Sequence, residues 1–308
     1  MRSAMTSALL LAAVSGCGGT LSNDDIAFFE AVPRRDALHV KLPPASGQAL
    51  STLGPATVYT TAREIAAAVD AGLDGILGLL DLIRGVPPTT RTAYSRTWGP
   101  FPDREHPGVQ DRALMTRELN PDGSVYQYRY VIEASRPPGA ALPILEGTFY
   151  GAQARNGAGK VVIHFENSQA LGIARPSDPR EAMFINYDFT SDPKTLELDL
   201  GVGAAGGFGL PAFNYGYASY ADGHGRFDYG APDGKGNVLT SQTSFTRTSA
   251  GRALIVVTHP PFFEDRIVEC WDDTVSLTYI DDPGGILPQC NRVAPCVLGD
   301  VKSCPALP

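Results

Sequence analysis

The sequence predicts a mainly β protein: a large curled antiparallel sheet or incomplete barrel of about a dozen strands, with one long N-terminal helix packed on its concave face. The chain is rich in glycine (33) and proline (25) and also contains 12 tyrosines and 13 phenylalanines. This composition is typical of short strands joined by tight turns. One segment alone, from Thr61 to Arg84, has the apolar periodicity of a long helix.

Apolar and polar residues alternate in successive short segments between Arg91 and Ile280, which predicts strands with one buried face. Turn sequences such as Asn120-Pro121-Asp122-Gly123 separate these segments, so neighbouring strands should be antiparallel. A sheet this large must close or curl to protect its edges, and the helix is the natural element to fill it. The alternating apolar positions are Tyr126, Tyr128, Tyr130 and Ile132; Val161, Ile163 and Phe165; Ile185, Tyr187 and Phe189; Leu196, Leu198 and Leu200; Leu254 and Val256; Val275, Leu277 and Tyr279.

The predicted helix begins at Thr61, because Thr61 and Glu64 have the spacing of a capping box. It ends before Gly85 and the two prolines that follow. Its polar face carries aspartates, so an anionic membrane surface would repel it and we expect a core helix. Its apolar stripe consists of Ile65, Val69, Leu73, Ile76, Leu77, Leu80 and Ile83.

We expect a single folded domain over residues 37–282, followed by a tail at 283–308 that is rich in proline and cysteine. The domain should begin with a half-buried strand from Ala37 to Leu42, where apolar and polar residues alternate. The formal net charge is −8, and the sequence contains no long basic cluster. These features exclude nucleic acid as a main partner.

The N-terminus has a charged start, an apolar run from Ala8 to Val14 and small residues after it, the layout of a secretory signal. The sequence Val14-Ser15-Gly16-Cys17 resembles the lipobox of bacterial lipoproteins. That resemblance implies a signal peptide at residues 1–16, lipid attachment at Cys17 and a tether at residues 17–36. It also implies residence in the outer membrane rather than the inner one, on its periplasmic side or at the surface, because residue 18 is glycine and not aspartate.

The other four cysteines, Cys270, Cys290, Cys296 and Cys304, lie together near the C-terminus. In an exported chain such a set predicts two disulfides, and no paired C-x-x-C motif suggests zinc. Four cysteines allow three pairings. We favour Cys270–Cys290 and Cys296–Cys304, because the second closes a small loop and the first attaches the tail to a strand.

The sequence contains no local signature of catalysis or of a cofactor, so we expect no enzyme and no bound cofactor. Gly201, Gly203 and Gly206 match a dinucleotide fingerprint in letters, but no helix follows them. A catalytic triad assembled from distant strands stays open as an alternative. The nearest approach to a calcium site is four oxygen-bearing residues whose spacing departs from the EF-hand pattern, and we prefer to read them as hairpin turns. They are Asp222, Asp228, Asp233 and Asn237.

A helix against a curled antiparallel sheet is similar in architecture to the lipoprotein-carrier class of periplasmic folds. That resemblance implies a half-barrel that binds a hydrophobic or lipid ligand, which is our first hypothesis. The alternative is a structural or protein-interaction lipoprotein of the cell envelope with a filled core, and a hydrolase with an unrecognised site is a third. An apolar cavity of roughly 300–1,000 Å³ would favour the first hypothesis, and a filled core would favour the second.

Overall fold

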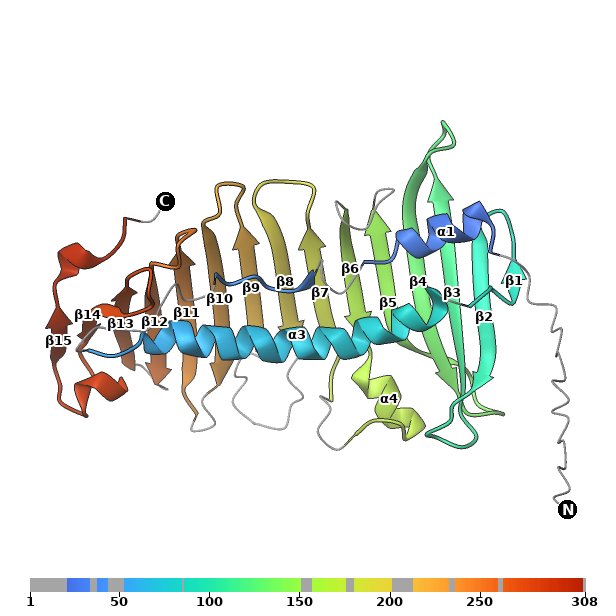
Figure 1. Ribbon diagram of the computed structural model, residues 1–308. Helices are drawn as coiled ribbons and strands as arrows, with labels where there is room; N and C mark the ends of the chain where they lie inside the picture. Colours follow the sequence, from blue (N-terminus) through green and yellow to red (C-terminus); the bar gives the residue numbers. More distant parts are fainter. Residues whose placement is uncertain are drawn as a thin grey trace, which may run out of the picture.

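The computed structural model describes residues 21–33, 38–43, 53–84, 86–150, 157–175, 180–200, 213–232, 236–259 and 263–306. The protein is mainly β, as predicted. Its strands form a single antiparallel sheet of 15 strands, and one helix lies across it (Figure 1). Each strand pairs with its neighbours in the chain, so the strand order is the sequence order from β1 to β15.

The strands are β1 (Thr90–Arg91), β2 (Ser95–Pro102), β3 (Gln110–Leu119), β4 (Val125–Ser135), β5 (Leu142–Tyr150), β6 (Ala158–Ile163), β7 (Met183–Asp188), β8 (Lys194–Leu200), β9 (Asn214–Ser219), β10 (Gly225–Pro232), β11 (Val238–Phe245), β12 (Gly251–His259), β13 (Phe263–Trp271), β14 (Leu277–Asp282) and β15 (Cys296–Gly299). The helices are α1 (Asn23–Glu30), α3 (Thr57–Arg84) and α4 (Phe165–Leu171), with short 3-10 turns η2 (Pro288–Cys290) and η3 (Val301–Ser303).

The sheet is neither closed nor strongly curled, so the predicted incomplete barrel with a concave face is wrong (Figure 1). The alternation of apolar residues defines which face is buried but carries no information on curvature. The strands at the two ends of the sheet are very short, two residues in β1 and four in β15. Short end strands limit edge-to-edge pairing, so this sheet does not need closure for that purpose.

Helix α3 contains 28 residues and runs across the strands on one face of the sheet (Figure 1). At 1.5 Å per residue its length is about 42 Å. Its N-terminal end contacts β13, where the rings of Tyr59 and Trp271 lie 5.5 Å apart. At the other end Arg84 donates to the carbonyl oxygens of Val32 and Pro33, just after α1. We call the face beneath α3 the covered face and the opposite face the open face.

The covered face is filled by large side chains from nearly every strand. Residues that face one another across neighbouring strands are buried together, as in the row that joins Tyr130 with Gly147, Val161, Ile185 and Leu198. Two apolar clusters result, one extending from β2 to β11 and one at the C-terminal end of the sheet. The most deeply buried large side chains are Trp98, Trp271, Tyr59, Tyr130, Phe28, Phe149, Phe227, Leu38, Leu73 and Met115.

Two local predictions around α3 need correction. The helix begins at Thr57 rather than Thr61, because Glu269 on β13 accepts the N–H of Val58 at 2.8 Å and caps the helix from the sheet. The predicted strand from Ala37 to Leu42 does not join the sheet over its described part, residues 38–42. That segment lies along α3 instead, where the N–H of Val40 donates to Asp70 at 3.0 Å. The alternation there reflects burial against a helix.

Helix α1 lies within the range predicted as a tether, and it is docked on the N-terminal strands. Its Asp25 is fully buried and accepts hydrogen bonds from Arg96 at 2.5 Å and Arg91 at 3.1 Å. Burial raises the pKa of Asp25, but the hydrogen bonds from Ser22 and the two arginines outweigh it and lower the pKa to about 2. The neighbouring Asp24 pairs with Arg96 and Arg117 at the surface.

We predict that Asp25→Asn lowers the free energy of unfolding by about 3 kcal/mol at pH 7, since breaking a buried ion pair leaves Arg96 incompletely paired. Because the folded state lowers the pKa of Asp25, this stability is present above pH 4 and is lost as the pH falls toward 2. Urea unfolding at several pH values measures both effects. The matched control is Asp24→Asn, whose side chain is 40% exposed and should cost about 1 kcal/mol or less. Equal losses in the two variants would contradict this account.

Candidate functional site

Along each strand, side chains on the open face of the sheet alternate with side chains that point into the core. On β8, Glu197 and Asp199 are exposed, whereas Leu196 and Leu198 are buried. In the described part of the chain, the C-terminal tail packs on this face at its β13–β14 end, as shown below. The described residues thus leave the middle of the open face exposed to solvent.

A hollow of about 310 Å³ lies in the open face where β8, β9, β10 and β11 run side by side. It forms because Gly216 on β9 occupies an outward position and has no side chain. A Cβ on Gly216 would meet nothing closer than the Cβ of Asp228 at 4.0 Å, so the space above this glycine is empty. A glycine inside a strand often marks a place where another group approaches the backbone.

The walls of the hollow are polar and acidic. Glu197 and Asp199 stand on β8, Asp228 on β10, and no lysine or arginine is among the lining residues. Asp228 is partly withdrawn from water, which raises its pKa, while the nearby Arg226 guanidinium lowers it. Arg226 lies at the rim of the hollow, and its Nε donates to a carboxylate oxygen of Asp228 at 2.6 Å. The remaining polar side chains in the lining are Asn214, Thr240 and Gln242.

Two ion pairs elsewhere on the open face join neighbouring strands. Arg112 on β3 pairs with Glu133 on β4 at 2.5 Å, and Arg129 on β4 pairs with Glu146 on β5 at 3.2 Å. The hollow differs from these one-to-one pairs because three carboxylates there lie near one cation, Arg226. It is accordingly an acidic spot on this face.

The hollow is not a metal site by its geometry. Within the described ranges, no group of three or more His, Cys, Asp or Glu side chains is close enough together to hold a metal ion. The calcium candidates are also separated: Asp222 lies in the turn before β10 and contacts His224, whereas Asp228 lies further along that strand. Asn237 precedes β11, and Asp233 lies outside the described residues. The hairpin-turn interpretation accounts for Asp222.

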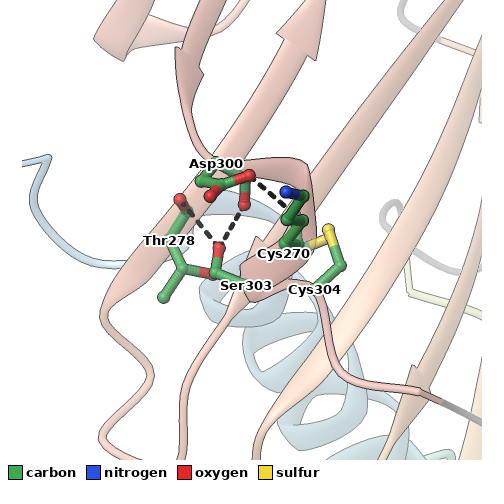
Figure 2. The surroundings of a disulfide bond; sticks show 6 residues. Cys270, Thr278, Asp300, Ser303 and Cys304 are labelled. Carbon is green, nitrogen blue, oxygen red and sulfur yellow. Dashed lines mark hydrogen bonds between the residues drawn. A yellow bond between two sulfur atoms is a disulfide. The ribbon is translucent and has the colours of Figure 1, made fainter.

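The four C-terminal cysteines form two disulfides, but not with the favoured pairing. Cys270 bonds to Cys304, and Cys290 bonds to Cys296. Cys270 points away from the covered face, so its disulfide holds the tail on the open face over β13 and β14 (Figure 2). There Ser303 donates to the carbonyl oxygens of Thr278 and Asp300 (Figure 2). Sequence spacing could not reveal this pairing, because it depends on how the tail folds back.

The predicted lipidation site, Cys17, lies outside the described residues. No helix in the described ranges combines the length and the apolarity needed to cross a bilayer.

Histidines in the described segments contact carboxylates. His106 contacts Asp103 at 2.7 Å, close to it in sequence, whereas His39 contacts Asp74 on α3 at 2.9 Å, far from it in sequence. Within the described residues, neither histidine hydrogen-bonds a serine, threonine or cysteine side chain that could serve as a nucleophile.

Two features escaped sequence reasoning although signals for them exist. Ser22 and Asp25 have capping-box spacing, which marks the start of α1. Gly216 interrupts a strand in which polar residues alternate with tyrosines, and it marks the hollow. Comparison of the chain with protein-family models, with curated proteins and with solved structures found no match.

Proposed function

We propose that this chain is an exported, lipid-anchored protein of the cell envelope that binds a partner through the open face of its sheet. The observation that carries the proposal is the asymmetry of the sheet: one face is filled by α3 and the large rings beneath it, and the other faces solvent. The hypothesis of a structural or protein-interaction role predicts a filled core, and this packing supports it. The packing of the covered face supplies no support for a hydrophobic ligand held in a half-barrel.

The partner we propose is a protein that presents a lysine or arginine side chain to the hollow. The open face is broad and is not strongly curled, so its shape suits another protein surface. The hollow, at about 310 Å³, is of a size suited to one long side chain. Its carboxylates, Glu197, Asp199 and Asp228, complement a cation, and they are too dispersed to hold a metal ion. Charge complementarity of this kind mainly sets specificity and association rate.

Filling the hollow tests this proposal. We expect Gly216→Val to keep the fold, because there is free space for the side chain and valine favours strands. The variant should bind hexalysine at least tenfold more weakly than the wild-type protein, measured by calorimetry at low salt. Asp199→Asn should weaken binding in the same direction. Thr148→Val, on the same face of β5, is the matched control and should bind normally.

Further ligands in the same experiment show whether the partner's cationic group belongs to a protein or to a free polyamine. Hexalysine should bind, whereas acetylated hexalysine and hexaglutamate should not. Tighter binding of spermidine than of hexalysine would indicate that the partner is a free polyamine and not a protein. Failure of hexalysine to bind, or equal binding by the wild-type protein and Gly216→Val, would overturn the proposal.

The anchor is supported by the lipobox sequence and by the position of α1. If the chain is processed at Cys17, only residues 18–22 separate the lipid from the docked helix. Six peptide spacings reach at most roughly 20 Å, so the β1–β3 end of the sheet would stay close to the bilayer. This is a shorter connection than the expected tether of residues 17–36.

We predict that Cys17→Ser moves the protein from the membrane fraction to the soluble extracytoplasmic fraction, since the remaining signal would still direct export. Fractionation followed by immunoblotting measures the change. Cys304→Ser is the control, because it removes a different cysteine, breaking the Cys270–Cys304 disulfide, and leaves the lipobox intact. Membrane retention of the Cys17→Ser protein would contradict lipid anchoring.

A further inference from the structure

Glu269 is a fully buried carboxyl group at the junction between the sheet and the helix that crosses it. It lies on β13 with its side chain on the covered face, and its exposed fraction is 0%. Its cross-strand neighbours are Ala253 and Ile280, both also fully buried. An acidic side chain in such surroundings strongly disfavours its ionised form unless it is well paired.

The partners of Glu269 come from the first turn of α3. One carboxyl oxygen accepts the N–H of Val58 at 2.8 Å, and the N–H of Thr57 also contributes to holding the carboxylate. The other oxygen, Oε2, has no hydrogen-bond partner among the described residues. The carboxylate therefore caps the helix, but only half of its acceptor capacity is used.

Among the described residues, no cation forms an ion pair with Glu269. Tyr229 on β10 interacts with the carboxyl group electrostatically, and Tyr59 on α3 packs against Trp271 on the same strand as Glu269. On η2, the side-chain amide of Gln289 donates to the hydroxyl of Thr57 at 2.7 Å. Two further ionisable side chains lie at this end of the molecule. The exposed Arg63 on α3 interacts with Tyr59, and the buried Asp282 on β14 accepts the N–H of Leu287.

Burial raises the pKa of Glu269 by more than the two helix N–H groups lower it, so the pKa rises from 4.5 to about 7. When the first turn of α3 leaves the sheet, water reaches the carboxyl group and its pKa returns toward the ordinary value. A proton thus binds the docked state more tightly than the undocked state. Docking is strongest below pH 4.5, weakens as the pH rises toward 7, and levels off above it.

We propose that Glu269 is a proton-binding site that makes the docking of the N-terminal end of α3 on the sheet respond to pH. The neutral acid fits its apolar surroundings, and the ionised carboxylate loosens the same contact. The loosening would extend to the C-terminal end of the core, because Gln289 and the Pro55–Ser276 bridge depend on the same turn of the chain. This device is independent of the proposed partner and of the hollow.

Hydrogen exchange of the full chain tests this inference. After correction for intrinsic rates, opening of the amides from Val58 to Ala62 should increase on the order of 30-fold between pH 5.5 and pH 8. In Glu269→Gln the increase should disappear, because glutamine is uncharged at both pH values. The control Glu264→Gln removes a carboxyl group that is 49% exposed on the same strand, and it should behave like the wild-type protein.

A second measurement keeps the inference testable if Glu269→Gln does not fold. Carbon-13 NMR of the wild-type protein labelled at glutamate side chains should show one carboxyl group that titrates near pH 7. All glutamates titrating between pH 4 and 5 would overturn the proposal. Equal pH dependence of exchange in the wild-type protein and a folded Glu269→Gln variant would do the same.

Discussion

The packing of α3 across the strands is the constraint on which the rest of this structure depends. Hydrogen bonds link each strand only to its immediate neighbours in the chain, so they tie together residues that are close in sequence. Helix α3 instead reaches from β13 at one end to the segment after α1 at the other. Removing apolar area from water along this whole length is the main source of long-range order in the sheet.

A single covering layer has a direct consequence for function. With one face filled, the described residues leave the opposite face of a wide sheet to solvent, apart from the end near β13 and β14 where the tail packs. Ion pairs join opposite charges across β3, β4 and β5, whereas the hollow over Gly216 concentrates carboxylates. The same architecture places Glu269 under the helix N-terminus, where a proton can change how firmly the covering layer is held.

The sequence predicted the features that depend on local periodicity. Strands such as β4 and β7 were found from alternation, and the end of α3 was found from Gly85 and the prolines. The start of α3 could not be found, because its cap comes from Glu269, more than two hundred residues away. Curvature, the disulfide pairing and the hollow are likewise set by tertiary packing. Gly216 marks the hollow in the sequence, but only the register of β8–β11 brings the carboxylates beside it.

Hydroxyl-radical footprinting tests most directly whether one face is covered and the other is open. Two pairs of rings provide internal controls, because each pair shares a strand and points to opposite faces. On β5, Tyr150 is 42% exposed, whereas Phe149 is buried. On β7, Phe184 is 38% exposed, whereas Tyr187 is buried. This account predicts rapid oxidation of Tyr150 and Phe184 and strong protection of Phe149 and Tyr187. Equal protection of all four rings would contradict it, because a second layer would then cover the face that we describe as open.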